Sequence, residues 1–213
     1  MNIIDEELNR FNKILMEELS VIPPEISLTV NQFISAKSKK IRPSLIFLFA
    51  NAMDIKITDA ILKLAVSVEI IHNATLIHDD IIDDAKIRRG RISLNKELGN
   101  NLSVLTGDIL LSVAMKNLSS FGNIEIIDLF SLALQKMCIG EINQNSSLNK
   151  LPSYDEYINK SKNKTAELFL ASLEALCILE NLSERQYIKD FALNYGIAFQ
   201  IRDDLNNILK KTI

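Results

Sequence analysis

The sequence predicts an all-α fold, and three observations support that prediction. Apolar residues recur at helical spacings of three and four, as in Ile61, Leu64, Val68 and Ile71. The strict alternation of apolar and polar residues that marks a half-buried strand is not sustained in any segment. No repeat, linker or block of charge divides the 213 residues. We therefore expect a single domain over residues 1–213, built as a bundle of mostly antiparallel helices.

Turn and capping residues place the individual helices. Prolines open the second and third predicted helices, where a missing N–H group is tolerated. Ser153 with Glu156, and Ser183 with Gln186, match the capping box, in which two side chains satisfy backbone N–H groups at a helix start. A longer connection, rich in basic residues, is expected near 85–95. The predicted helices are 4–20, 24–36, 42–53, 58–84, 99–119, 123–147, 153–178 and 183–210.

The composition excludes several classes of protein. With 47% hydrophobic residues and a net charge of −3, the chain is too apolar and too weakly charged to be disordered. The slight acidic excess argues against a nucleic-acid binder. Cys138 and Cys177 match no disulfide framework or metal motif, which favours a reducing compartment, the cytoplasm. Apolar runs are either too short to span a bilayer or interrupted by charged residues, so no transmembrane segment is expected.

The helix predicted over 58–84 is apolar on most faces but ends in four aspartates, Asp79, Asp80, Asp83 and Asp84. Residues four apart share one face of a helix, so the carboxylates of Asp79 and Asp83 repel each other. They also lie at the negative end of the helix dipole. A solvated acidic helix end is the simpler interpretation. A bound cation explains the repulsion better, and oxygen ligands favour a hard ion such as Mg²⁺.

Two further polar clusters accompany this acidic end. The basic residues that follow it are Lys86, Arg88, Arg89 and Arg91. A basic run is commonly a solvated surface, but paired arginines also bind phosphate oxygens bidentately. The polar residues that end the last apolar helix are Gln200, Asp203, Asp204 and Asn207. If the two acidic helix ends face each other across the bundle, they hold several metal ions around one polyanionic ligand, which indicates a phosphorylated substrate.

These motifs resemble those of the trans-isoprenyl diphosphate synthases, the polyprenyl synthetase family, and in particular its long-chain, octaprenyl-like type. The most specific element is His78-Asp-Asp-Ile-Ile-Asp83 followed by Arg88-Arg89-Gly90, which resembles the first aspartate-rich motif of the family. Other segments resemble family motifs in the same order: Lys39-Lys40-Ile41-Arg42-Pro43, the Gly-Asp turn at Thr106-Gly107-Asp108, Gly140-Glu141-Ile142-Asn143-Gln144, Lys164-Thr165, and Phe199-Gln200-Ile201-Arg202-Asp203-Asp204. The resemblance covers most of the chain, and it implies helices around a central apolar cavity.

The resemblance also implies roles for individual residues. The implied catalytic residues are Asp79, Asp80, Asp83, Arg88 and Lys164. Two or three Mg²⁺ ions, with Mn²⁺ as an alternative, are implied at Asp79, Asp83 and Asp203. Isopentenyl diphosphate is implied at Lys39, Arg42, His72 and Arg89. The allylic diphosphate is implied at Arg88, Lys164, Thr165 and Gln200. Helical spacing agrees in one respect, because His72 lies two turns before Asp79 on the same face. A homodimer is implied as well.

For such an enzyme, the implied reaction is ionisation of the allylic C–O bond, attack on the cation by the double bond of isopentenyl diphosphate, and loss of a proton. Apolar helices exclude water from the cation and hold the growing chain. In the family, aromatic residues one turn before the first motif stop growth early, whereas Ala74 and Thr75 are small here. The resemblance therefore implies a long all-trans polyprenyl diphosphate, delivered to membrane enzymes.

Three features depart from the family pattern. Ser38 replaces a glycine of the phosphate loop, and Asn207 replaces the last aspartate of the second motif. The chain ends at Ile213, with only Lys210 and Lys211 in place of a later lysine-bearing loop, so we expect a C-terminal truncation. These departures leave alternatives open: a non-catalytic or regulatory subunit of a heteromeric synthase, a short-chain (farnesyl or geranylgeranyl) synthase, or a terpene cyclase or squalene-type enzyme.

Overall fold

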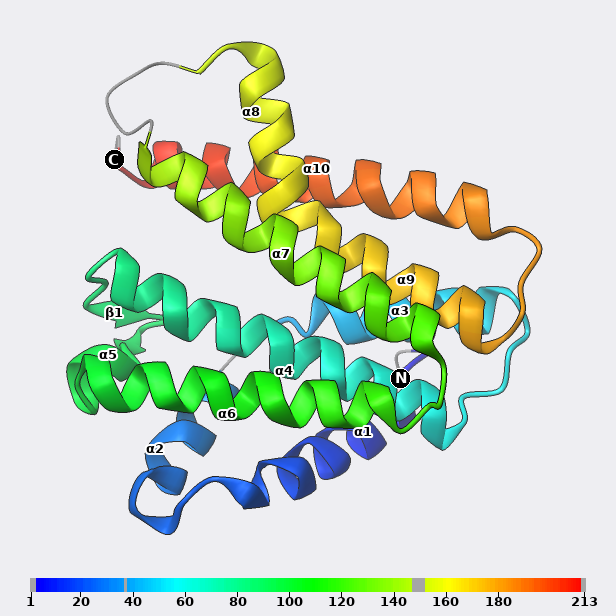
Figure 1. Cartoon of the computed structure of the whole chain (residues 1–213), viewed down its shortest axis with the longest axis horizontal. Helices are drawn as coiled ribbons and strands as arrows, with labels where there is room; N and C mark the ends of the chain where they lie inside the picture. The colour runs from blue at the N-terminus through cyan, green and yellow to red at the C-terminus, as the bar shows by residue number, and fades with distance from the viewer. Residues whose placement is uncertain (1–2, 37, 147–151, 212–213) are drawn as a thin grey trace. The chain divides into compact units, whose positions relative to one another are not determined.

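The computed structural model describes residues 3–36, 38–146 and 152–211, and it confirms the all-α fold (Figure 1). The elements are α1 Asp5–Glu18, η1 Leu19–Val21, α2 Pro24–Ser35, α3 Ile41–Ala52, α4 Asp59–Ile82, β1 Ile87–Arg88, β2 Arg91–Ile92, α5 Leu94–Glu97, α6 Asn100–Ser119, α7 Ile124–Ser146, α8 Tyr154–Ser161, η2 Lys162–Ala166, α9 Glu167–Leu179 and α10 Arg185–Lys211. They form two compact units, Met1–Gly122 and Asn123–Ile213. The single domain over residues 1–213 stays a prediction.

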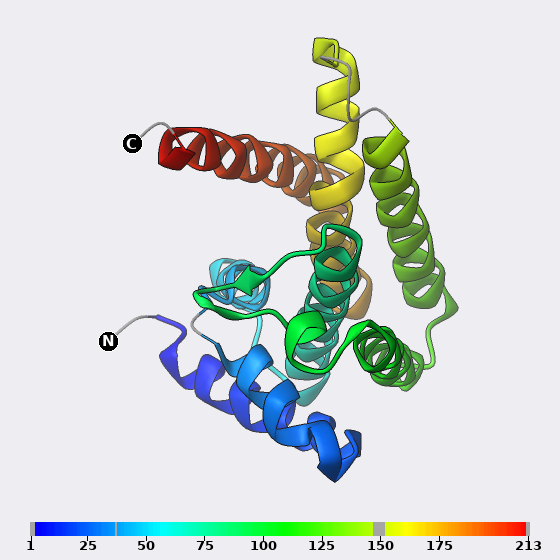
Figure 2. The same cartoon turned by 90° about the vertical axis from the view of Figure 1, so that its left-hand side faces the viewer.

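The first unit is built around α4. The Thr58 hydroxyl caps this helix by accepting a hydrogen bond from the Ile61 N–H at 3.4 Å. α6 packs along α4, and α1 and α3 also contact it; Figure 2 shows α1 and α2, in blue, at the edge of the unit. α4 is long and apolar enough to cross a membrane, yet 72% of its most apolar window is buried inside the protein. Such burial is typical of a core helix that is apolar on most faces, as its sequence predicts.

The basic connection after α4 contains structure that the sequence analysis did not anticipate. Strands β1 and β2 form a two-stranded antiparallel hairpin in which Ile87 pairs with Ile92 and Arg88 with Arg91. The two turn residues, Arg89 and Gly90, both have positive φ, at 52° and 77°. A two-residue turn with positive φ at both positions matches the twist of the flanking strands, which explains why the hairpin closes here. The short helix α5 follows at Leu94–Glu97.

The second unit contains α7 to α10. The capping box at the start of α8 is confirmed, because the Ser153 hydroxyl accepts from the Glu156 N–H and the Glu156 carboxylate accepts from the Ser153 N–H. The helix predicted over 153–178 is confirmed, since the chain is helical from Tyr154 to Leu179, but five of its residues, η2, form a π-helix that the sequence did not predict. The capping box predicted at Ser183 is also wrong, because α10 begins only at Arg185 and its cap position falls on Glu184.

Packing in the second unit brings α10 very close to η2. A Cβ atom placed on Gly196 would lie only 2.4 Å from Ala166 Cα and 3.2 Å from Phe169 Cδ2. Phe169 is fully buried, and its ring packs edge-on against Tyr195 with centroids 5.3 Å apart. The absent side chain at Gly196 therefore sets the distance between α10 and η2.

Candidate functional site

The four aspartates at the end of α4 divide into two groups. Asp79 is half-buried and Asp83 is exposed, and their spacing places them on one face of the helix. Asp80 is fully buried on another face, where its Oδ1 accepts a hydrogen bond from Arg88 Nε at 2.8 Å. Asp84 pairs with Lys96 of α5, and that hydrogen bond lowers the pKa of Asp84. Two of the four carboxylates are thus paired with cations of the same unit.

The remaining pair, Asp79 and Asp83, fits the ligand preference of Mg²⁺. Among the residues that the structure describes, no three His, Cys, Asp or Glu side chains gather into a metal cluster. Mg²⁺ does not need such a cluster, because proteins usually bind it through one or two carboxylates while substrate phosphates and water complete the octahedron. The fit requires a phosphorylated ligand close to this helix end.

Burial and the charge of nearby cations both act on His72, which lies two turns before Asp79. The pKa of His72 lies well below its usual value because burial disfavours the imidazolium, and because Arg42, Arg89 and Lys40 add positive potential. His72 is therefore neutral at pH 7. A neutral imidazole among cations offers one N–H donor to an anion without adding a charge to the site.

The two lysines before α3 lie in different environments. Lys39, the predicted ligand of isopentenyl diphosphate, is exposed. Lys40 turns inward, and its Nζ donates to Glu69 Oε1 at 3.0 Å and to the Ile34 carbonyl at 3.3 Å. The Ser38 hydroxyl, at the position where the family carries glycine, is buried and has no hydrogen-bond partner among the described residues.

Two buried polar residues of α4, Glu69 and Asn73, were missed by the sequence analysis. The Asn73 Nδ2 group donates to the Glu69 carbonyl at 2.7 Å, and its Oδ1 accepts from Arg89 Nη1 at 3.3 Å. Both side chains are almost completely buried. The available signal was their spacing of four on an otherwise apolar helix, with Glu69 one turn before His72 and Asn73 directly after it.

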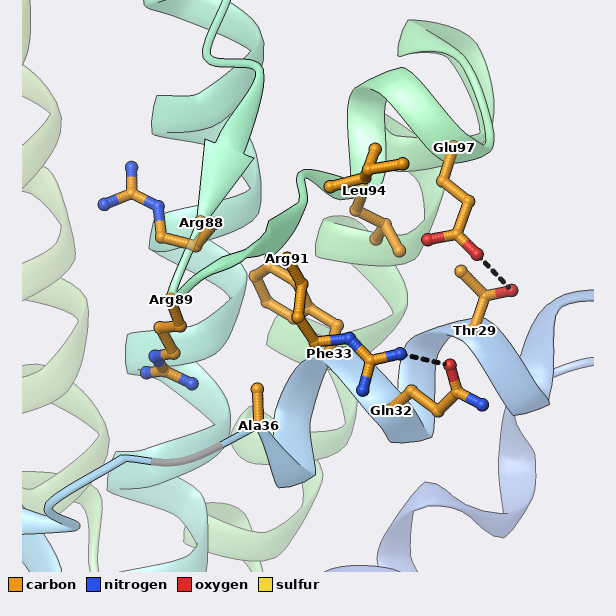
Figure 3. Close-up of a pocket in the computed structure, with 10 residues that line it drawn as sticks. Thr29, Gln32, Phe33, Ala36, Arg88, Arg89, Arg91, Leu94 and Glu97 are labelled. Atoms are coloured by element: carbon orange, nitrogen blue, oxygen red, sulfur yellow. Dashed lines mark hydrogen bonds between the residues drawn. The ribbon is translucent and has the colours of Figure 1, made fainter.

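A pocket lies between the hairpin and α2 (Figure 3). It is lined on the hairpin side by Arg88, Arg89 and Arg91, and its walls also include Phe33 of α2. Figure 3 shows Arg91 pointing to α2, where its Nη2 donates to Gln32 Oε1 at 2.7 Å. The three arginines make this pocket strongly basic.

The Thr106-Gly107-Asp108 segment lies inside α6, as the helix predicted over 99–119 implies, and it forms no turn. A Cβ on Gly107 would lie 2.2 Å from His78 Nε2, so a larger residue there would displace the His78 ring. His78 Nε2 lies 3.5 Å from Asp108 Oδ1. α6 therefore fixes the residue that immediately precedes Asp79.

In the second unit, η2 carries two of the predicted site residues, Lys164 and Thr165, and their side chains contact different helices. Lys164 Nζ forms an ion pair with Glu141 Oε2 of α7 at 2.5 Å. The Thr165 hydroxyl donates to Gln200 Oε1 of α10. The predicted metal ligand Asp203 is 47% exposed on α10. A π-turn changes the phase of a helix locally, so neighbouring residues can reach different partners, and such turns often occur at functional sites.

Asp204 is held from two sides by side chains of the second unit. Tyr157 donates its hydroxyl to Asp204 Oδ2 at 2.8 Å, and Gln200 Nε2 donates to Asp204 Oδ1 at 2.9 Å. The pKa of Tyr157 is raised, first by burial and then by this carboxylate. Tyr157 was not predicted, because a tyrosine 47 residues earlier carries no sequence signal of this contact. The side chains of Gln144, Asn207, Lys210 and Lys211 lie outside the described residues.

The sequence model described as "Polyprenyl synthetase" matches residues 23–212. The chain belongs to the polyprenyl synthetase family. It is 36% identical over 210 residues to a prenyl transferase of Cyanidium caldarium, covering 96% of this chain and 65% of that protein. It is 38% identical over 184 residues to the decaprenyl-diphosphate synthase of Dictyostelium discoideum, covering 85% of this chain and 40% of that protein. It is 32% identical over 218 residues to the chloroplastic solanesyl diphosphate synthase 2 of Arabidopsis thaliana, covering 99% of this chain and 52% of that protein.

Solved structures of polyprenyl synthetases share this fold. The decaprenyl diphosphate synthase of Rhodobacter capsulatus matches with a TM-score of 0.89 at 32% identity, covering 95% of this chain and 63% of that one. The polyprenyl synthase of Caulobacter crescentus CB15, complexed with calcium and isoprenyl diphosphate, matches with a TM-score of 0.87 at 29% identity, covering 94% and 62%. The chain spans 40 to 65% of the length of the three curated relatives named above.

The predicted site residues of this polyprenyl synthetase fall into two groups. The first unit carries Lys39, Arg42, His72, Ala74, Thr75, Asp79, Asp80, Asp83, Arg88 and Arg89. The second unit carries Lys164, Thr165, Gln200 and Asp203. Their roles in binding and catalysis stay predictions.

Proposed function

We propose that this chain acts as a trans-polyprenyl diphosphate synthase, which condenses an allylic diphosphate with isopentenyl diphosphate into a long-chain product. The observation that carries the proposal is the arrangement along α4: Arg89 donates to Asn73, which directly follows His72, and Asp79 and Asp83 share a face two turns further on. The positive potential of Arg42, Arg89 and Lys40 at His72 agrees with this arrangement. A diphosphate needs several cationic donors, whereas a metal bridging to a second diphosphate needs adjacent carboxylates. α4 carries the carboxylates and His72, and the segment around the start of α3 and the hairpin after α4 supply the cations.

In this proposal the basic cluster of the first unit binds isopentenyl diphosphate. Arg42 and Arg89 offer planar guanidinium groups suited to bidentate contact with phosphate oxygens. Neutral His72 adds a directed N–H donor. Lys39 is exposed and adds long-range attraction, while Lys40 is held by Glu69.

Mg²⁺ is the proposed cofactor, in two or three ions, with Mn²⁺ as the alternative. Asp79 and Asp83 are the proposed metal ligands in the first unit, and Asp203 is a proposed metal ligand in the second. When bound, the metal neutralises the diphosphate leaving group of the allylic substrate. Asp80 supports the site by holding Arg88 at the hairpin rather than by adding a ligand, because its Oδ1 is engaged by that guanidinium.

The second unit is proposed to bind the allylic substrate through Lys164, Thr165 and Gln200. The π-turn η2 presents Lys164 and Thr165 from consecutive positions. Asp204, fixed by Tyr157 and Gln200, keeps the polar end of α10 ordered beside Asp203.

A long product is proposed from the small residues before the first aspartate motif. Relatives named decaprenyl and solanesyl diphosphate synthases support it. Ala74 is fully buried, whereas Thr75 is half-buried and shares the helix face of Asp79. Thr75 is therefore the better placed of the two to contact a growing chain. A product of farnesyl or geranylgeranyl length would instead support the short-chain alternative.

The deciding experiment incubates the purified chain with Mg²⁺, radiolabelled isopentenyl diphosphate and farnesyl diphosphate, and separates the products by chain length. We expect a ladder that ends in a long prenyl diphosphate. Asp79→Asn should lower turnover at least about 100-fold, the order of effect of lost electrostatic stabilisation. The matched control Asp84→Asn should stay within twofold, because Asp84 is exposed and pairs with Lys96. Failure of the wild-type chain to consume isopentenyl diphosphate, or an active Asp79→Asn, contradicts the proposal.

A second candidate is a non-catalytic subunit of a heteromeric synthase, favoured by Asn207 in place of an aspartate ligand. This candidate predicts product formation only after mixing with a catalytic partner. A homodimer is the expected state of the catalytic form, and light scattering coupled to gel filtration measures it. The cytoplasm is the proposed compartment, and cell fractionation tests it against the chloroplast named for the Arabidopsis relative.

A further inference from the structure

Glu69 and Asn73 lie one turn apart on α4 and connect two segments that are distant in sequence. Glu69 accepts from Lys40, which directly precedes α3, and Asn73 accepts from Arg89 in the hairpin turn. The Asn73 amide is oriented by Glu69, since its Nδ2 donates to the Glu69 carbonyl at 2.7 Å and lies 3.4 Å from Oε1. This orientation leaves Asn73 Oδ1 facing the guanidinium.

Both residues that this pair holds have a left-handed backbone. Lys40 has φ 44° and ψ 42°, and Arg89 has φ 52°. Such a conformation is unfavourable for a residue with a Cβ atom, and it persists only where the surroundings fix it. Lys40 and Arg89 belong to two separate segments, and their side chains bond to Glu69 and Asn73, which lie one turn apart. This arrangement indicates that Glu69 and Asn73 fix both segments.

Burial prevents water from replacing these contacts. Glu69 is 2% exposed and Asn73 is fully buried, so neither can exchange its partner for water. An uncompensated carboxylate at that depth is costly, which favours the conformation in which Lys40 and the Asn73 amide both face it. Burial lowers the pKa of Arg89, while Glu69 raises it and so favours the charged guanidinium.

We propose that Glu69 and Asn73 are positioning residues that hold the Lys39–Arg42 segment and the Arg89–Gly90 turn at a fixed separation across α4. In this way they shape the isopentenyl diphosphate site. They touch no substrate themselves. This inference rests on the proposed function for its kinetic part, whereas the holding of the two segments is measurable without any substrate.

The experiment compares Asn73→Leu and Glu69→Gln with the wild-type chain. Hydrogen exchange is read by mass spectrometry, and KM and kcat are measured for both substrates. We expect Asn73→Leu to speed amide exchange in residues 87–92 and to raise KM for isopentenyl diphosphate about tenfold, the scale of one lost hydrogen bond to a charged group. KM for farnesyl diphosphate and kcat should change less than twofold, because Arg88, the residue assigned to the allylic diphosphate, is held separately by Asp80. Glu69→Gln keeps the acceptor and the shape but removes the charge, so it should speed exchange at residues 38–42 while the fold is retained.

Asn117→Leu is the matched control. Asn117 is also a buried asparagine, and it lies on α6 near Ser120, which accepts from Lys63 at the opposite end of α4. This variant should leave exchange at residues 87–92 and KM for isopentenyl diphosphate unchanged. A wild-type chain without activity refutes the proposed function, and the exchange data then decide the inference alone. Unchanged exchange at residues 87–92 in Asn73→Leu, a uniform increase over the whole unit, or an unchanged KM in an active variant overturns the inference.

Discussion

Replacing Gly196 by alanine tests whether α10 can tolerate any side chain where it contacts η2. The new Cβ would lie 2.4 Å from Ala166 Cα and 2.6 Å from Ala166 Cβ, whereas ordinary van der Waals contact begins at 3.4 Å. The difference, 3.4 − 2.4, means that α10 must move away by about 1 Å. Neither contact can be relieved by a rotamer change, because Ala166 has no flexible side chain. The backbone of the helix has to shift.

Two opposing effects set the magnitude. Overpacking of a filled core costs about 1–3 kcal/mol, and the upper part of this range, about 2–3 kcal/mol, applies here because the helix backbone has to shift. Alanine is favoured over glycine inside a helix by about 1 kcal/mol. We therefore expect a net destabilisation of about 1–2 kcal/mol. The displaced helix also carries Gln200, one turn after Gly196, so a shift of this size breaks its hydrogen bond with Thr165.

Urea denaturation followed by far-UV circular dichroism measures this change. With a slope of about 2 kcal/mol per molar urea, the midpoint should fall by roughly 0.5–1 M. Gly140→Ala is the matched control, since its Cβ would meet Asn163 Cβ of the same η2 segment at 3.1 Å. That contact needs a shift of only a few tenths of an ångström, and the gain in helix propensity offsets it. A midpoint that rises or stays constant in Gly196→Ala refutes the reasoning.

Three further predictions concern titration, thiol reactivity and the end of α10. The pKa of His72 is depressed, so its contribution to stability is complete above about pH 6.5 and is lost as the pH falls toward the folded-state pKa. The loss is at most about 1.4 kcal/mol per pH unit. The urea midpoints at pH 7.5 and pH 5.5 should therefore differ less in His72→Gln than in the wild type. Burial raises the pKa of Cys177 to about 11, whereas Cys138 is exposed, so a disulfide reagent at pH 8 should modify one thiol quickly and the second only after unfolding. Tyr157→Phe removes a hydrogen bond to Asp204 and should cost about 1 kcal/mol of stability in urea denaturation, and no change would show that the contact is energetically neutral.

The fold was largely predictable because its helices carry strong periodic signals. The helix predicted over 58–84 spans Asp59–Ile82 in the structure, since apolar residues cover most of its faces and Thr58 caps it. The interruption at η2 was not predictable from periodicity, because one π-turn shifts the phase without adding a breaking residue. The hairpin was missed since strands of two residues are too short for any alternation to register.

The candidate site was predictable where residues act through spacing along one helix. Asp79 and Asp83 share a face by spacing alone. The burial of Asp80 depends on Arg88 reaching back from the hairpin, which helical spacing does not encode. Glu69 and Asn73 were missed for the same reason, since their cationic partners come from other segments.

The contacts that shape the basic cluster of the first unit join residues that all lie between positions 40 and 89. Asp80 and Arg88 are eight residues apart, Asn73 and Arg89 sixteen, and Glu69 and Lys40 twenty-nine. The entropy cost of closing such loops grows only slowly with their length. During synthesis from the N-terminus, every one of these partners has been added to the chain before the first residue of α7. The contacts of this unit can therefore begin to form while the second unit is still being translated.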